Sequence, residues 1–154
     1  MMTLKTGDKV PVFTARDVRG ELFDSRTIIG KKIAVIYFYP KNDTAICTAQ
    51  ACSFRDSYQD FLDMGAEVIG ISSDNQESHQ EFSSKYKLPF LLLSDKDQKI
   101  KKQFGVGSRF FGLVSGRVTF VVDETGVVQM VFDSIFGRKH IINALNKIKE
   151  LTNK

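Results

Sequence analysis

The chain has 154 residues, of which 42% are hydrophobic and 26% are charged, and its formal net charge at pH 7 is +4. These values are typical of a soluble globular protein, and the length predicts a single domain over residues 1–154. The basic residues are scattered. Their densest cluster, Lys99, Lys101 and Lys102, is typical of a solvated helix face, so we expect no nucleic-acid partner.

No apolar run approaches the ~18 residues of a membrane-spanning helix, so we expect no membrane association. The N-terminal residues M-M-T-L-K-T-G-D lack the pattern of a signal peptide, which favours a cytoplasmic location. A transit peptide that had been removed would leave no trace, so an organelle such as a plastid is the alternative. Two cysteines are too few for a disulfide scaffold, which leaves a catalytic or a merely structural pair.

The first half of the chain predicts a hairpin, a buried strand and a helix. Phe13 and the Leu22-Phe23 pair, separated by a turn, indicate an N-terminal β-hairpin. The apolar run from Ile33 to Tyr39 indicates a central strand buried on both faces, which ends at Pro40 because proline cannot donate to a sheet. A helix follows, with Thr44 as its expected N-cap and Gly65 as its expected end. Its apolar residues recur with helical spacing at Cys47, Ala51, Phe54, Tyr58 and Phe61.

The second half alternates strands with helices and ends in a hairpin and a helix, which predicts an α/β fold. The expected elements are a strand over Glu67–Ile71, a helix that Asp74 caps and that ends near Tyr86, a strand over Phe90–Leu93, a helix over Lys96–Phe104 that ends at Gly105, a glycine-rich loop over Gly105–Gly116, a hairpin of Val118–Val122 and Val127–Phe132, and a helix over Lys139–Leu151. The apolar stripe of the last helix is expected to comprise Ile141, Ile142, Leu145, Ile148 and Leu151.

Cys47 lies close to the predicted start of the first helix. If Thr44 is the N-cap, Cys47 is the third helical residue, where unpaired backbone N–H groups and the positive end of the helix dipole stabilise a thiolate. Because the thiolate is the nucleophilic form, this position predicts a reactive cysteine. Groups expected to assist it are the Thr44 hydroxyl, the backbone N–H groups of Ile46 and Cys47, and a cation, for which we choose Arg117.

Cys52 follows five residues later, ~140° around the helix, on the face expected to carry Asp56 and Asp63. In an ideal helix the Cα atoms of Cys47 and Cys52 are ~8.7 Å apart. A disulfide rarely tolerates more than ~7 Å, so the two cysteines can pair only if the first turns of the helix unwind. The pair is therefore a candidate switch rather than a static crosslink.

These residues also fit other roles. On spacing alone, Cys47 fits a small buried hydrophobe as well as it fits a nucleophile. The cysteines together with His79 and His140 match no common zinc pattern, so we expect no metal, with His79 on a solvated helix and His140 near a helix start. Arg55 fits a structural and an electrostatic role equally well. The run G-V-G-S-R-F-F-G lacks the strand context of a dinucleotide site, so we expect no nucleotide.

The stretch from Pro40 to Cys47 has the pattern P-x-x-x-T-x-x-C, which resembles the active-site motif of peroxiredoxins. The continuation C-T-A-Q-A-C-S-F-R-D resembles the peroxiredoxin Q branch, also called the bacterioferritin comigratory protein family. The likeness extends over nearly the whole chain and includes G-A-E-V-I-G-I-S, Y-K-L-P-F, L-L-S-D and G-R-V-T-F-V-V-D.

This resemblance implies a thioredoxin-like fold, with a central mixed sheet flanked by helices, and the reduction of hydrogen peroxide and organic hydroperoxides. It implies that Cys47 is the peroxidatic cysteine and that Cys52 is the resolving cysteine. Thr44 would position the peroxide, Pro40 would shield the site, and Arg117 would stabilise the thiolate. The resemblance also implies recycling of a Cys47–Cys52 disulfide by thioredoxin or a similar dithiol protein, no metal or organic cofactor, and a monomer.

One departure from the family pattern concerns the first helical turn. The family usually has T-P-G-C, whereas this chain has T-A-I-C, with Ala45 and Ile46. Proline suits the first helical position, and glycine permits close approach and easy unwinding. We therefore expect Ile46 to affect substrate access or the unwinding step, and the chemistry of Cys47 to be retained.

Two other functional classes remain as alternatives. A general thiol-disulfide oxidoreductase would use the same fold, but that activity usually relies on C-x-x-C, which this chain lacks. A non-catalytic binding or holdase module would have inert cysteines. Insulin reduction without peroxide consumption would indicate the first, and an unchanged mass after peroxide treatment would indicate the second.

Overall fold

The computed structural model describes residues 3–106, 117–134 and 137–153. Its elements alternate in the predicted α/β order. They are β1 (Thr14–Arg16), β2 (Leu22–Asp24), the 3-10 turn η1 (Ser25–Thr27), β3 (Ile33–Phe38), α1 (Ala45–Asp56), α2 (Tyr58–Asp63), β4 (Ala66–Ser72), α3 (Gln76–Tyr86), β5 (Leu91–Ser94), α4 (Lys99–Phe104), β6 (Val118–Val122), β7 (Val128–Asp133) and α5 (Gly137–Thr152).

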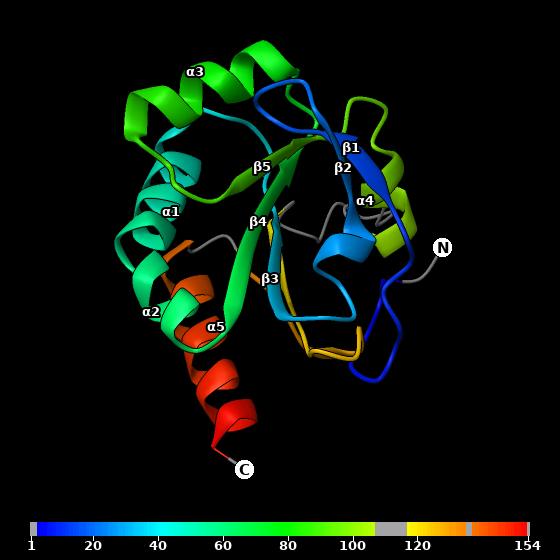
Figure 1. The fold of residues 1–154 in the computed structure, drawn as a ribbon. Helices are drawn as coiled ribbons and strands as arrows, with labels where there is room; N and C mark the ends of the chain where they lie inside the picture. Colours follow the sequence, from blue (N-terminus) through cyan, green and yellow to red (C-terminus); the bar gives the residue numbers. More distant parts are fainter. Residues whose placement is uncertain (1–2, 107–116, 135–136, 154) are drawn as a thin grey trace.

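Among the described residues, seven strands form one mixed sheet in the order β2-β1-β5-β4-β3-β6-β7. Strand β4 runs parallel to β3 and β5, whereas β6 runs antiparallel to β3 and β7. Helices α1, α2 and α5 lie on one side of the sheet and α4 lies on the other (Figure 1). The predicted central mixed sheet, its flanking helices and the N-terminal β1–β2 hairpin are confirmed.

Strand β3 lies in the interior of the sheet, between β4 and β6, and is buried on both faces, as its unbroken apolar run predicted. Val35 and Tyr37 pack in the cluster that faces α1, α2 and α5, while Ala34 and Ile36 pack in the cluster that faces α4. This division follows from the two-residue period of a strand, which sends successive side chains to opposite faces. Both layers of the core therefore pack against β3.

The register of β6 on β3 determines which residues meet at the carboxyl end of β3. Val118 pairs with Phe38, so Arg117, just before β6, lies at the end of the sheet where the chain leaves β3 for α1. Tyr39 continues the ladder for one residue, its N–H donating to the carbonyl of Ile71 at 3.1 Å, and Pro40 follows. The break predicted at Pro40 is confirmed, and it delivers the chain to α1 beside Arg117.

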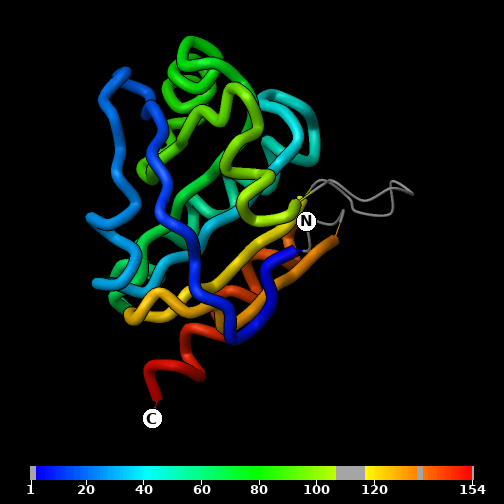
Figure 2. The backbone as a smooth tube through the Cα atoms, turned by 90° about the vertical axis from the view of Figure 1, so that its right-hand side faces the viewer, coloured from blue at the N-terminus to red at the C-terminus, as the bar shows by residue number. Residues whose placement is uncertain are grey.

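The N-terminal segment packs along the β6–β7 hairpin, as Figure 2 shows from the side. The N–H of Gly7 donates to the carbonyl of Val128 at 2.9 Å, and the N–H of Val10 donates to that of Gly126 at 3.0 Å. No helix within the described ranges is long and apolar enough to cross a membrane. Apart from Gly105 and Val106, the predicted loop over 105–116 lies outside the described residues.

Several predicted boundaries are wrong. The helix expected to continue to Gly65 is interrupted at Ser57, where the backbone leaves helical geometry at φ −100° and ψ 3°, so α1 and α2 are separate. Asn75 rather than Asp74 caps α3, because the Asn75 side chain accepts from the N–H of Ser78. Ile142 lies off the buried stripe of α5 and is 55% exposed. Apolar periodicity locates the helices but does not specify such local hydrogen bonds.

Candidate active site

Thr44 occupies the N-cap position of α1, as predicted. Its backbone is extended, with φ −88° and ψ 155°, and its carbonyl accepts the first helical hydrogen bond from Thr48 at 2.8 Å. Its hydroxyl does not cap the helix and instead donates to the carbonyl of Lys41 at 3.0 Å. The first turn therefore has no side-chain cap. Its backbone N–H groups can instead donate to a negatively charged group at the helix start.

Cys47 is the third residue of α1 and its side chain is buried, with 2% exposed. It packs in the apolar cluster formed on the α1 side of the sheet, whereas its neighbour Ile46 is 48% exposed. Cys52, on the same helix, is half-buried, and both thiols are free. Because both cysteines lie on intact α1, the helix geometry that separates them is present in this structure.

Arg117 is buried and contacts α1 through Gln50. Its Nη1 donates to the Gln50 Oε1 at 2.5 Å, and the Gln50 side chain is fully buried. Gln50 is three residues after Cys47, and positions three apart share one face of a helix. The start of α5 closes over this contact, since a Cβ added to Gly137 would lie 3.0 Å from the Gln50 Cβ. The guanidinium is thus held beside the helical face that carries Cys47.

The Tyr37 ring lies close enough to Cys47 and Arg117 for their charges to affect its pKa. It stacks on Phe54 of α1 with ring centroids 4.5 Å apart, and Gly70 leaves room for it, because a Cβ there would lie 2.9 Å from the ring. Burial raises the pKa of the Tyr37 phenol well above its usual range, with negative charge on Cys47 adding to the effect and Arg117 opposing it. Within the described part of the chain, the Tyr37 hydroxyl has no hydrogen-bond partner.

The loop between Pro40 and Thr44 is held by a buried polar network that the sequence did not reveal. The Asn42 side chain accepts from the Tyr39 hydroxyl at 2.6 Å, and its amide nitrogen lies 3.1 Å from the His79 Nδ1. The backbone N–H of Asn42 donates to the Asp74 carboxylate at 2.9 Å. The expectation that His79 lies on a solvated helix face is wrong, because its side chain is 1% exposed and completes this network.

His140 lies near the start of α5, as predicted, and it is fully buried. Its Nε2 lies 2.8 Å from the carbonyl of Ser134, which can only accept, so this nitrogen is the donor. Its Nδ1 then accepts from the Thr119 hydroxyl at 2.7 Å. Both ring nitrogens are used in a neutral ring. Among the described residues, no group of three or more histidine, cysteine or acidic side chains is placed to hold a metal ion.

The two histidines predict that folding stability falls on acidification. Burial lowers the pKa of both His79 and His140 below the usual 6.5. Below pH 6.5 the unfolded chain therefore binds protons that the folded chain does not, so stability is lost as pH falls from that value towards the folded-state pKa. Each histidine should contribute a slope of up to ~1.4 kcal/mol per pH unit. Urea unfolding at pH 7.5 and pH 5.5 measures this slope.

His79→Asn is the matched variant, because asparagine stays neutral and keeps an acceptor close to the position of Nδ1. It should lower stability at pH 7.5 by about 1–3 kcal/mol, through the lost packing and hydrogen bonds, and should flatten the dependence between pH 7.5 and 5.5. An unaltered slope in both His79→Asn and His140→Asn would assign the acid sensitivity to other groups.

Arg55, whose role the sequence left open, has structural contacts. Its Nη1 donates to the carbonyl of Tyr86 at 2.8 Å, and its Nε donates to the adjacent Asp56 carboxylate at 3.0 Å. The first contact ties the end of α1 to the end of α3.

The structure brings Thr44, Cys47, Cys52 and Arg117 to one region around α1, with Pro40 exposed at the entrance to the preceding loop. Sequence reasoning missed Gln50 and Asn42. Gln50 could have been identified from the sequence, because it is a polar residue on the apolar stripe of the helix, one turn after Cys47. Nothing in the local sequence distinguished Asn42 from an ordinary loop residue, because its partners include Asp74 and the first turn of α3, more than thirty residues later in the chain.

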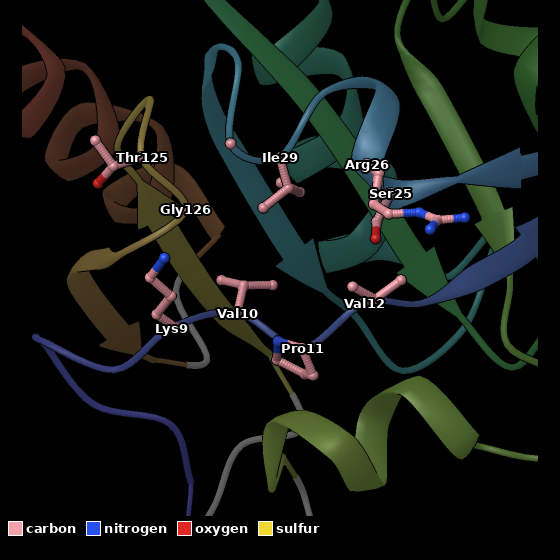
Figure 3. Close-up of a pocket in the computed structure, with 10 residues that line it drawn as sticks. Lys9, Val10, Pro11, Val12, Ser25, Arg26, Ile29, Thr125 and Gly126 are labelled. Carbon is pink, nitrogen blue, oxygen red and sulfur yellow. The ribbon is translucent and has the colours of Figure 1, made fainter.

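A surface pocket of about 180 Å³ lies elsewhere on the molecule. Figure 3 shows it between Lys9–Val12, the Ser25-Arg26 pair and the Thr125-Gly126 turn. That turn joins β6 to β7 at the end of the sheet where β3 begins, since Val122 pairs with Ala34. The pocket is therefore at the opposite end of β3 from Cys47, and neither cysteine lines it.

Comparison with known proteins identifies the family. Residues 6–131 match the model of the AhpC/TSA family. The chloroplastic peroxiredoxin Q of Sedum lineare is 48% identical over 146 residues, which cover 94% of this chain and 78% of that protein. The chloroplastic peroxiredoxin Q of Populus jackii is 46% identical over 146 residues, which cover 94% of this chain and 68% of that protein.

Solved structures of peroxiredoxins have the same fold as this chain. The peroxidoxin BcpB of Mycobacterium tuberculosis superposes with a TM-score of 0.88 at 31% identity, covering 96% of this chain and 98% of that one. The peroxiredoxin Q of Xanthomonas campestris superposes with a TM-score of 0.81 at 27% identity, covering 91% of each chain. The predicted thioredoxin-like fold is confirmed. The chain belongs to the AhpC/TSA family, in the peroxiredoxin Q branch, and is a thiol-dependent peroxidase.

Proposed function

We propose that Cys47 is the peroxidatic cysteine and Cys52 the resolving cysteine of this peroxidase. The observation that carries the proposal is the placement of a buried free thiol at the third position of α1, on the helical face that Gln50 links to the Arg117 guanidinium. Unpaired helical N–H groups and a guanidinium both favour the thiolate and the negative charge that develops on the departing oxygen.

In the first step the Cys47 thiolate attacks the terminal oxygen of R–O–O–H. An S–O bond forms, the O–O bond breaks, and the electron pair leaves with the RO⁻ group, which takes a proton to become ROH. Cys47 is then a sulfenic acid. In this step Arg117 stabilises charge, the Thr44 hydroxyl turns from the Lys41 carbonyl to the peroxide, and Pro40 limits the access of water to the thiolate.

In the second step the Cys52 thiol condenses with the Cys47 sulfenic acid, forming an S–S bond and releasing water. Because an ideal helix holds the two Cα atoms ~8.7 Å apart, the first turns of α1 unwind before this bond forms. Thioredoxin or a similar dithiol protein then reduces the disulfide by thiol–disulfide exchange, and the thiols of both cysteines are restored. This cycle requires no metal or organic cofactor.

The remaining parts of the proposal concern organisation and location. Residues 1–154 form one domain that works as a monomer, since attacking and resolving cysteines are both supplied by α1. The names of the curated relatives give a chloroplast location and lend no support to the cytoplasmic expectation, so we favour the plastid alternative.

A coupled assay tests the function. Peroxide should drive NADPH oxidation in the presence of the protein, thioredoxin and thioredoxin reductase. A protein that reduces insulin briskly and consumes no peroxide would instead be a general thiol-disulfide oxidoreductase. If the protein consumed peroxide with glutaredoxin but not with thioredoxin, only the assignment of the reductant would be overturned.

Ile46 is expected to restrict bulky substrates. Its half-exposed side chain lies beside the buried Cys47, where the family usually has glycine. Ile46→Gly should raise the ratio of turnover with cumene hydroperoxide to turnover with hydrogen peroxide by several-fold, because only the larger substrate meets the removed side chain. The variant Leu62→Gly, at a similarly exposed apolar residue on α2, is the control. An unchanged ratio in Ile46→Gly would place the substrate path elsewhere.

A further inference from the structure

Tyr86, the last residue of α3, contacts the chain on both sides of the segment that carries the cysteines. Its hydroxyl donates to the Asp43 carboxylate at 3.0 Å, four residues before Cys47. Its carbonyl accepts from the Arg55 Nη1 at 2.8 Å, three residues after Cys52. One residue of α3 thus holds both flanks of the segment that must rearrange for the two thiols to meet.

The Tyr86 ring is itself held in place. It packs against Phe82 of α3 with ring centroids 5.3 Å apart, and the Lys85 ammonium lies 5.3 Å from its centroid. The same ammonium donates to the Asp43 carboxylate at 3.1 Å. Hydrogen bonds from Lys85 and Tyr86 lower the pKa of Asp43, so this acceptor is ionised at neutral pH. A charged acceptor strengthens the bond that the Tyr86 hydroxyl makes.

Asp43 has a left-handed backbone conformation. Its φ is +62°, in the left-handed region that few residues other than glycine, asparagine and aspartate adopt. The chain needs this conformation to turn from the loop into Thr44, the N-cap of α1. Releasing the Asp43 side chain would remove one of the contacts that offset the backbone cost and would free the entrance to the helix.

The two ends of this segment differ in how firmly they are held. The first turn of α1 has no side-chain cap and no acidic residue, which are the usual stabilisers of a helix start. The contacts of Asp43 with α3 therefore add to the buried Asn42 network in holding the entrance to α1. Movement of Cys47 towards Cys52 strains the Asp43 contact, and movement of Cys52 towards Cys47 strains the Arg55 contact.

We propose that Tyr86 is a latch that sets how often α1 unwinds, and hence how fast Cys52 resolves the Cys47 sulfenic acid. The inference rests on the proposed roles of the two cysteines. While the latch is closed, Cys47 is available to peroxide. When it opens, Cys47–SOH and Cys52–SH give the disulfide and water.

The latch also decides between two fates of the sulfenic acid. A second hydroperoxide that reaches Cys47–SOH before Cys52 does converts it to the sulfinic acid Cys47–SO₂H and releases ROH. The two reactions compete for one intermediate. A looser latch therefore favours the disulfide and protects the enzyme from inactivation by excess peroxide.

Rapid-quench mass spectrometry of Tyr86→Phe tests the latch. The substitution removes only the hydroxyl that binds Asp43 and retains the ring and the carbonyl that binds Arg55. We expect the step from sulfenic acid to disulfide to accelerate about two- to fivefold, as for the loss of one partly exposed hydrogen bond to a carboxylate. The rate of sulfenic acid formation should stay within twofold of the parent protein, and less sulfinic acid should accumulate at high peroxide.

Two further variants sharpen the test. Tyr58→Phe is the matched control, since the Tyr58 hydroxyl also donates to a carboxylate, Glu67 at 2.5 Å, but on α2. Asp43→Asn keeps a residue that tolerates left-handed backbone and removes the charge, so adding Tyr86→Phe to it should have a smaller effect than in the parent. A disulfide rate in Tyr86→Phe equal to that of the parent, or matched by Tyr58→Phe, would overturn the latch. A parent protein that forms no disulfide would overturn the proposed function instead.

Discussion

Replacing Cys47 with serine is expected to lower peroxide turnover by roughly a thousandfold or more, to the background of the uncatalysed reaction. The hydroxyl of serine is a far weaker nucleophile than a thiolate, and removal of a nucleophile commonly costs this much or more. The loss should not reflect unfolding, because serine fits the space of the buried thiol. NADPH oxidation in the coupled thioredoxin assay measures turnover, and urea unfolding checks that the fold is retained.

Cys52→Ser is the matched variant on the same helix. It should react with one equivalent of peroxide at the rate of the parent and then stop, with the sulfenic acid of Cys47 trapped and no disulfide for thioredoxin to reduce. Intact mass separates the outcomes, because the parent loses two hydrogen atoms and Cys52→Ser gains one oxygen. Complete loss of the first turnover in Cys52→Ser would contradict the division of roles between the two cysteines.

Arg117→Met is expected to slow the reaction of Cys47 with hydrogen peroxide by about 10²–10³-fold. Removing one preorganised donor to a developing negative charge commonly has an effect of this size. Methionine fills much of the buried volume, so a loss of charge rather than a cavity should dominate. Single-turnover rates measured by rapid quench isolate this step from the later disulfide and recycling steps.

Gln50 provides a graded control for this interpretation, because its Oε1 accepts from the Arg117 Nη1. Gln50→Leu should slow the first step by a smaller factor, whereas Gln50→Glu should slow it more than Gln50→Leu, because a buried carboxylate beside Arg117 offsets the guanidinium charge that stabilises the anion. Arg55→Met removes a guanidinium that binds the Tyr86 carbonyl and should leave the first step nearly unchanged. Equal losses in Arg117→Met and Arg55→Met would indicate a general effect of net charge.

The fold was predictable where one residue pattern had one physical solution. The run from Ile33 to Tyr39, bounded by glycine and proline, predicted a strand buried on both faces, and Pro40 predicted its end. The helical spacing from Cys47 to Phe54 placed α1 and put Cys47 in its first turn. The end of that helix was not predictable, because the interruption at Ser57 removes no apolar residue from the periodic pattern and depends on local hydrogen bonding.

The prediction that His79 lies on a solvated helix face was the clearest error. His79 lies among polar residues of α3, and no apolar pattern around it predicted that its side chain is buried. Its neighbours in space are Tyr39 and Asn42, nearly forty residues earlier in the chain. A buried polar residue is recognised by its partners, and these partners come together only when α3 packs beside the end of β3.

The chemistry available to this protein could be worked out from its residues alone: a thiol in the first turn of a helix, a second thiol on the same helix too far away to pair, and a helix start with alanine and isoleucine where the family usually has proline and glycine. These follow from covalent spacing and helix geometry, which are local. The groups that surround that thiol depend on how the chain packs in three dimensions. Arg117 reaches α1 through the register of β6 on β3, and Tyr86 reaches both flanks of the cysteine segment through the packing of α3, because contacts between distant parts of a chain are fixed by how its layers pack.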